Sequence, residues 1–225
     1  MKKLTFCIFI LTMVSCKPFQ NIAYNVDKLE TMNIGNNNPT ISVQTFEDIR
    51  SQSEINSTHF TYKQWSTKIN GVQSCINSEV LYKTPVANQM TNIFVHHLSK
   101  KIPQIRVISN QKDYSDYYLE AKVKHFYGIQ KFSTSAAVGA QFGLIGAIAT
   151  AGAKTNGKII IELTDIKLFD RRNNLIASIG DLRKEYEGDF PANANCTCIY
   201  HNVNQKLLEF NEELIGLLSL EIQNR

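Results

Sequence analysis

The spacing of apolar and polar residues along the chain predicts a set of strands and two helices. Apolar residues recur every three or four positions over 85–100 and 200–223, and this spacing predicts two amphipathic helices. Alternating residues predict strands over 40–46, 106–109, 117–130, 158–169 and 175–186. This order of elements predicts an α+β fold, with a mostly antiparallel sheet and two helices packed on one face.

Local signals refine several of these elements. Thr84 and Pro85 are typical of a helix start, with a capping hydroxyl and a proline in the first turn. The polar residues 170–174 predict a hairpin turn, and a slip in the apolar phase predicts a β-bulge near Thr164 and Asp165. A short strand is expected over 62–69. The last helix is apolar over about half of its circumference, which favours contact with a sheet and the other helix over contact with a partner.

The N-terminus has the pattern of a lipoprotein signal peptide. Two lysines precede the apolar run 4–14, whose eleven residues are too few for a bilayer span of about 20 residues. Met13-Val14-Ser15-Cys16 then resembles the lipobox of bacterial lipoproteins, in which the cysteine is diacylated and becomes the new N-terminus. Two acyl chains anchor a protein stably. The prediction is removal of residues 1–15 and a palmitate-bearing anchor in the lipid bilayer at Cys16.

The residue after the cysteine bears on the destination. Lys17 stands where signals for retention in the inner membrane typically have Asp, so the resemblance implies the outer membrane, with the protein facing the periplasm. Residues 16–39 are mainly polar and are predicted to be a flexible linker. A single domain is then expected over 40–225, with a Gly/Ala-rich insertion at 132–157.

The centre of that insertion is the most unusual stretch of the sequence. Residues 136–153 carry no charge, and small residues fall four apart at Gly139, Gly143, Ala147 and Ala151. On a helix these residues would permit close backbone contact, which predicts membrane contact or self-association. The alternative is a Gly/Ala-rich loop without such a role, because each glycine costs about 1 kcal/mol in a helix.

Three cysteines remain after Cys16 and the signal peptide are set aside. In an oxidising envelope compartment we expect a disulfide between Cys75 and either Cys196 or Cys198. A metal site built from these three cysteines and His201 is the alternative, although this ligand spacing is unusual for zinc.

The sequence offers little support for catalysis or for nucleotide and nucleic-acid binding. Gly152–Lys158 matches the first seven positions of a phosphate-binding loop, but Ile159 replaces the Ser/Thr that binds magnesium and opens a β-branched run. No HExxH or GxSxG motif is present. The formal charge of +4 includes Lys2 and Lys3 of the signal peptide, so the mature chain carries about +2 and lacks the strong basic balance of nucleic-acid-binding proteins. No catalytic residue, metal or cofactor is predicted.

Three stretches carry a resemblance to a known class of proteins. Ile41–Arg50 (ISVQTFEDIR), the helix opened by Pro85-Val86, and Ser115–Phe126 (SDYYLEAKVKHF) resemble small envelope lipoproteins of the YajG type and the auxiliary lipoproteins of ABC transport systems. The resemblance implies a non-catalytic periplasmic domain that acts as a binding or assembly subunit in lipid transport or envelope maintenance. The alternatives are an oligomeric pore or secretion component that uses residues 136–153, and an envelope hydrolase with a dispersed site.

Overall fold

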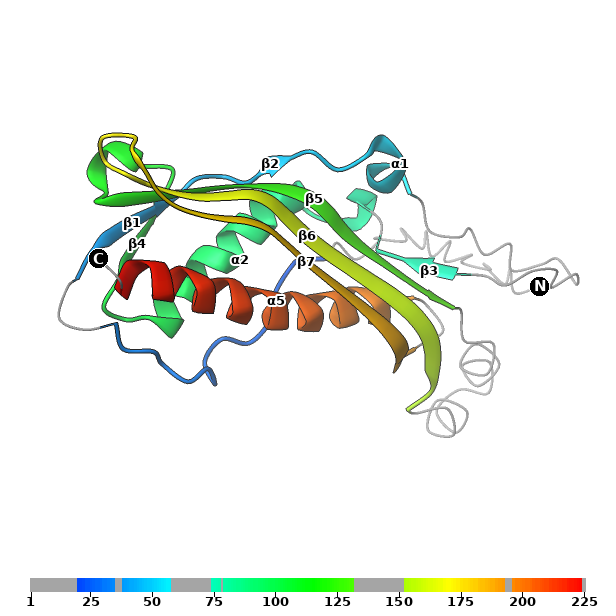
Figure 1. The fold of residues 1–225 in the computed structure, drawn as a ribbon. Helices are drawn as coiled ribbons and strands as arrows, with labels where there is room; N and C mark the ends of the chain where they lie inside the picture. The colour runs from blue at the N-terminus through cyan, green and yellow to red at the C-terminus, as the bar shows by residue number, and fades with distance from the viewer. Residues whose placement is uncertain are drawn as a thin grey trace, which may run out of the picture.

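The computed structural model describes residues 20–34, 38–57, 74–77, 79–131, 152–192 and 196–223. Its helices are α1 (Gln52–Ile55), α2 (Val86–Lys101) and α5 (Cys198–Gln223), with short 3-10 helices η1 (Glu79–Leu81) and η2 (Lys112–Tyr114). Its strands are β1 (Thr40–Val43), β2 (Glu47–Asp48), β3 (Ser74–Ile76), β4 (Arg106–Ser109), β5 (Tyr117–Lys131), β6 (Lys154–Asp170) and β7 (Leu175–Pro191). Three long strands curve over α2 and α5 (Figure 1).

The seven strands form one mixed sheet. Its main path is β4-β1-β5-β6-β7, and β2 and β3 also pair with β5. β1 is parallel to both β4 and β5, and β2 is parallel to β5, whereas β3, β6 and β7 are paired in antiparallel fashion. The predicted mostly antiparallel sheet with two helices is therefore wrong: the sheet is mixed, and the described residues form three α-helices. The predicted order of strand, helix and strand over 40–109 is a crossover, and a crossover returns the chain to a parallel neighbour.

The core lies between the sheet and the two long helices. β5, β6, α2 and α5 each contribute side chains that are at most 2% exposed, among them Phe126, Ile161, Phe94 and Phe210. α5 contacts β5, β6, β7 and α2, so most of its wide apolar arc is covered within the chain. Leu220, near the end of the helix, is a large exposed apolar residue.

The start of α2 differs from its prediction. Pro85 is the N-cap and offers no side-chain bond, and the helix begins at Val86. The carboxylate of Glu79 instead accepts the Val86 backbone N–H at 3.1 Å. A negative group at this end also suits the helix dipole. The cap that Thr84 was expected to provide thus comes from η1.

The β6–β7 hairpin is longer than predicted and contains the expected bulge. Each strand has 17 residues. Their register shifts between Leu163 and Ile166, and Asp165 has a φ of 52°. The bulge near Thr164 and Asp165 is confirmed. Gly180 lies opposite Ile166 with a φ of 79°, a conformation that glycine adopts without steric cost.

Residues 20–34, which we call the N-terminal segment, pack on the two helices as a third layer. Ile22 and Val26 are buried. The Ile22 N–H donates to Gln89 of α2 at 2.7 Å, and at the far end the Met32 N–H donates to the Lys101 carbonyl at 2.6 Å. The predicted flexible linker over 16–39 is therefore wrong for these residues. Ile22, Tyr24 and Val26 alternate with the exposed residues Asn21, Ala23 and Asn25, which gives the segment a side that faces the helices.

Several predicted features fall outside the described residues. They are the signal peptide 1–15, Cys16 and the strand expected over 62–69. In the described part of the chain, no helix combines the length and the apolar character needed to cross a membrane.

Candidate functional site

The chain enters the described fold at Gln20, beside η1. The Gln20 N–H donates to the Leu81 carbonyl at 2.7 Å, and the Lys83 N–H donates to the Gln20 carbonyl at 3.3 Å. These bonds form a parallel bridge between Gln20 and Tyr82. Cys16 precedes Gln20 by four residues, a chain length that spans at most about 14 Å. A lipid on Cys16 would hold η1 within that distance of the attachment point.

A buried hydrogen-bonded chain fastens the N-terminal segment to both helices. His97 of α2 is 0% exposed, with the Tyr24 hydroxyl 2.9 Å from its Nδ1 and a Glu212 oxygen 2.6 Å from its Nε2. Lys101 donates to the other Glu212 oxygen at 2.7 Å, and Asn211 donates to the Tyr24 hydroxyl. Because the carboxylate accepts from Nε2–H, Nδ1 of the neutral ring accepts from Tyr24.

Burial determines the charge of this histidine. Burial lowers the pKa of His97, and the Glu212 carboxylate only partly opposes that effect. For Glu212, burial acts to raise the pKa, but the bonds from Lys101 and His97 outweigh it and the pKa is lowered. The arrangement therefore holds a neutral ring against an ionised carboxylate. Its evident role is to position the N-terminal segment.

Cys75 and Cys196 form a disulfide at one end of the sheet. Their Cα atoms are 5.3 Å apart and the bond joins residues separated by 121 positions. It ties β3 to the residues just before α5. Cys198 is not part of the disulfide, and burial raises the pKa of its thiol. His201 is exposed on α5.

The disulfide between Cys75 and Cys196 decides whether the three cysteines and His201 can form a metal site. A sulfur atom within a disulfide is not the thiolate that a metal binds. In the structure Cys75 and Cys196 therefore cannot act as ligands beside Cys198 and His201. Across the described ranges, no group of three or more His, Cys, Asp or Glu side chains is arranged to hold a metal ion.

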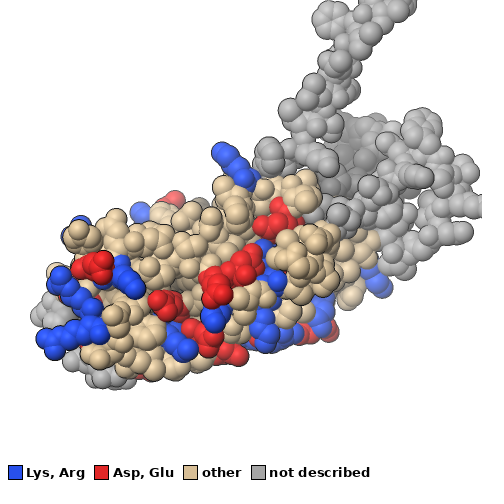
Figure 2. All heavy atoms as spheres, turned by 90° about the horizontal axis from the view of Figure 1, so that it is seen from above, with Lys and Arg blue, Asp and Glu red and all other residues tan. Residues whose placement is uncertain are grey.

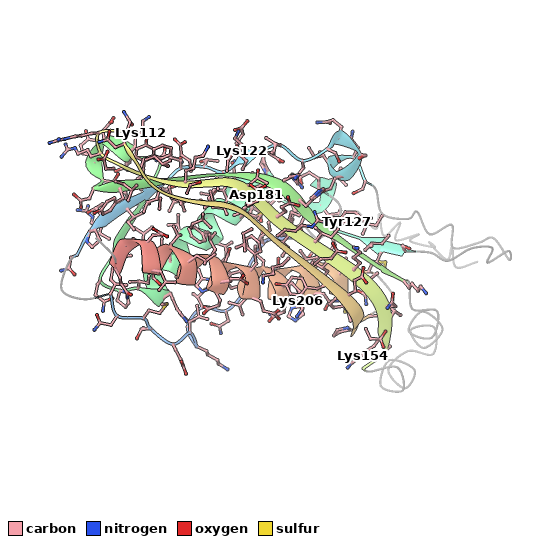
Figure 3. The ribbon with its side chains drawn as sticks, in the orientation of Figure 1. Lys112, Lys122, Tyr127, Lys154, Asp181 and Lys206 are labelled. Atoms are coloured by element: carbon pink, nitrogen blue, oxygen red, sulfur yellow. A yellow bond between two sulfur atoms is a disulfide. The ribbon has the colours of Figure 1, made fainter. Side chains whose placement is uncertain are left out.

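The Gly/Ala-rich insertion leaves and rejoins the sheet at the end that holds this disulfide. Lys131 pairs with Ser74, the neighbour of Cys75, and Gln130 pairs with Gly157 of β6. Figure 3 places Lys154 at this end and Lys112 at the opposite one. The residues proposed for membrane contact or self-association, Gly139, Gly143, Ala147 and Ala151, lie outside the described residues.

The stretch that resembles a phosphate-binding loop continues into a strand. Gly152 has a φ of 85°, and β6 begins at Lys154, so the motif's Lys158 lies within the strand. A phosphate-binding loop instead leads into the N-terminus of a helix. The backbone here therefore lacks the cradle of N–H groups that binds phosphate.

The face of the sheet opposite the long helices carries a ladder of ion pairs. Glu162 has a side chain 5% exposed and receives bonds from Lys124 at 2.9 Å and from Arg183. Burial acts to raise the pKa of Glu162, but the two cations outweigh it and lower it. Lys158 continues the ladder to Glu185. Both signs of charge intermix on this face (Figure 2), which gives no basic surface for nucleic acid.

The other end of the molecule, which we call the distal end, exposes apolar and basic side chains. It consists of η2 and the β6–β7 turn, which are joined by a bond of 3.1 Å from the Arg171 N–H to the Asp116 carbonyl. Tyr114 is 80% exposed and Leu175 is 53% exposed. The exposed basic residues of this end are Lys112, Arg171 and Arg172, and the acidic residues Asp113 and Asp116 are exposed at and beside η2. Figure 2 shows basic side chains with some acidic ones at the left end of the view.

Sequence reasoning missed both the distal end and the buried chain at His97. The period-two run of Ile22, Tyr24 and Val26 was a signal for an ordered N-terminal segment. No comparable signal identified His97, because its partners Tyr24 and Glu212 are 73 and 115 residues away in sequence.

Comparisons with known proteins identify no family for this chain. No family model matches, and no curated protein matches. A crystal structure from Xanthomonas campestris, described as DUF330, is 14% identical, covers 92% of this chain and 95% of its own, and has a TM-score of 0.46. An uncharacterised protein is 12% identical, with coverage of 84% and 98% and a TM-score of 0.44. A PelC dodecamer from Paraburkholderia phytofirmans is 11% identical, with coverage of 81% and 91% and a TM-score of 0.32. These likenesses are too distant to carry a function, so the resemblance to YajG-type and ABC-auxiliary lipoproteins stays a prediction.

Proposed function

We propose that this chain is a non-catalytic, lipid-anchored subunit of the cell envelope that binds a protein partner at its distal end. The observation that carries the proposal is the separation of two surfaces. The chain enters the fold at η1, where the Tyr82 ring packs on Phe126 of β5. Tyr118 lies on the same strand eight residues away, which corresponds to about 26 Å, and its hydroxyl donates to Asn173 in the β6–β7 turn of the distal end at 2.8 Å. One end suits anchoring and the other is available for binding.

The anchor itself rests on the sequence. Diacylated Cys16 places the protein on a membrane, and Lys17 favours the outer membrane, with the domain facing the periplasm. The disulfide between Cys75 and Cys196 is consistent with an oxidising compartment. Confinement to a membrane raises the effective concentration of the domain near other envelope components, so that a weak contact suffices for assembly.

The distal end has the chemistry of a protein-binding surface. Exposed tyrosine and arginine are the residue types that contribute most to binding energy at interfaces, and Tyr114 and Arg172 provide both. Leu175 adds apolar area beside them. Arg171 and Arg172, which are adjacent and exposed on the turn, favour an acidic group on the partner, whose charge would steer its approach. The proposal therefore specifies a protein partner with an acidic patch.

Capture of the acylated full-length protein from its native membrane in mild detergent tests this assignment. Arg172→Glu combined with Tyr114→Ala should reduce the recovery of the specific partner at least tenfold, as measured by mass spectrometry. Lys28→Glu is the matched control, because it reverses an exposed charge on the N-terminal segment and should leave recovery unchanged. Equal recovery with the distal double variant and the control would contradict the assignment.

A second candidate is an oligomeric pore or secretion component that uses residues 136–153. The observation that favours it is that the insertion leaves the sheet after Lys131 and rejoins it at Lys154, which Figure 3 shows at the end opposite Lys112 of the distal end. Gly139→Leu combined with Gly143→Leu should then abolish detergent-stable oligomers. A parent protein that stays monomeric at all concentrations would reject this candidate.

A further inference from the structure

We infer that η1 and the first turns of α2 form a membrane-docking surface, with lipid headgroups as the partner; the inference rests on the proposed anchor at Cys16. The stretch of chain between Gln20 and the lipidated residue is short. Gln20 is fixed by hydrogen bonds to Leu81 and Lys83, and it lies four positions after the lipidated residue. A chain this short spans at most about 14 Å, so η1 cannot move far from the bilayer.

The chain direction at Gln20 orients η1 relative to the bilayer. The bridge between Gln20 and Tyr82 is parallel. At Gln20 the direction toward the N-terminus is therefore also the direction from Tyr82 back along Glu79–Leu81. Val80, the central residue of η1, is 63% exposed. Its side chain is positioned to enter the interface between headgroups and acyl chains.

The side chains at the start of α2 suit an anionic membrane surface. α2 contains no Asp or Glu, and its exposed residues Asn88, Asn92, His96 and Lys100 fall four apart along one side. Lys83 is exposed just before the helix. Cations close to a membrane surface are attracted to its anionic lipids. α2 therefore brings no carboxylate near the phosphate groups, and the Glu79 carboxylate of η1 is paired with Arg50 at 2.9 Å and accepts the Val86 N–H.

A groove of about 360 Å³ extends this surface. It lies between the N-terminal segment and α2, with Asn21 on one side and Lys83, Asn92 and His96 on the other. These side chains can donate hydrogen bonds to a phosphate, whose charge Lys83 would neutralise. The groove begins at Lys83, so it is continuous with the surface around η1.

Acidic residues limit the contact to this part of the molecule. Asp27 and Glu30 are exposed farther along the N-terminal segment, toward its contact with the end of α2. Docking therefore favours the start of α2 over its end. A domain held in this way is tilted, with the distal end directed away from the bilayer and accessible to a protein partner.

Depth-dependent fluorescence quenching tests the docking surface directly. Trp65 is the only tryptophan, so a Trp65→Phe background permits a single probe at Val80→Trp or, as a matched control, at Leu175→Trp in the distal end. The acylated proteins are reconstituted in phosphatidylcholine–phosphatidylglycerol vesicles whose acyl chains are brominated. Quenching of the Val80→Trp probe should exceed that of the Leu175→Trp probe at least threefold. Equal quenching, or stronger quenching at Leu175→Trp, would overturn the inference.

Lysine footprinting gives a second readout without any substitution. In the acylated parent, acetylation of Lys83 should be at least threefold slower in vesicles than in detergent, while Lys112 at the distal end should react equally in both. Equal rates for Lys83 would contradict the docking surface. Flotation with vesicles separates this failure from failure of the anchor: a protein that does not float lacks the lipid, whereas one that floats with unprotected Lys83 docks by another face.

Discussion

Removing a single hydroxyl that is bonded to two buried side chains should release the N-terminal segment from the helices. In Tyr24→Phe, His97 Nδ1 loses its donor and the Asn211 amide loses its acceptor. These two residues are 0% and 2% exposed, so water cannot easily replace the hydroxyl. Each buried polar group left without a partner costs about 1 to 3 kcal/mol. Allowing for some relaxation, we expect Tyr24→Phe to lower the free energy of unfolding by about 2 to 4 kcal/mol.

Two measurements separate release of the segment from general destabilisation. Urea unfolding gives the global loss, and the rate of trypsin cleavage after the exposed Lys28 reports opening of the segment. Tyr114→Phe is the matched control, because that hydroxyl belongs to a side chain that is 80% exposed, and it should change stability by less than about 0.5 kcal/mol. If Tyr24→Phe matched this control in both measurements, the buried chain would not be what fastens the segment.

Three further predictions follow from the core and the disulfide. Because burial lowers the pKa of His97, the unfolded state takes up the proton first, and stability should fall as the pH drops below about 6.5. In urea unfolding, His97→Gln should remove most of the decrease in the free energy of unfolding between pH 7 and pH 5, whereas His96→Gln should retain it. The same pH dependence in both variants would contradict this assignment to His97. Cys196→Ser should lower the free energy of unfolding by about 4 to 5 kcal/mol, because the disulfide closes a loop of 121 residues. Reduction of the parent should have the same effect. Peptide mapping that finds another cysteine pairing would refute this prediction. Gly128→Ala should lower stability by about 1 to 3 kcal/mol, because its Cβ would lie 2.5 Å from Val203, whereas Gly216→Ala on α5 meets nothing within 4 Å and should be neutral or stabilising; equal melting temperatures would exclude this clash.

Local patterns in the sequence predicted the elements better than their arrangement. The helix at 86–101 and the bulge at Asp165 depend on residues within a few positions of each other, so periodicity reveals them. The pairing of β1 with β5 joins residues 76 positions apart, and the sequence alone does not specify such a partner. The order of strand, helix and strand over 40–109 implies a parallel crossover, as β1 and β4 show. The long predicted hairpin outweighed this signal and favoured a mostly antiparallel sheet.

The N-terminal segment shows why part of the site could not be predicted. Its composition is polar, which suggested a linker, and its docking depends on Gln89, His97 and Asn204 from distant parts of the chain. Such polar contacts leave no periodic signal. The same holds for the distal end, where a turn and a 3-10 helix come together only through the sheet. Both surfaces are built from residues that are far apart in the sequence, so only the folded structure reveals them.

Lipid attachment at Cys16 is the feature on which the proposed function depends most directly. In cells supplied with a clickable palmitate analogue, the parent should be labelled and its mature form should begin at Cys16 in the mass spectrum. A Cys16→Ser variant should carry no label and should retain residues 1–15. Equal labelling of the two proteins, or a mature parent protein without acyl chains, would contradict the account.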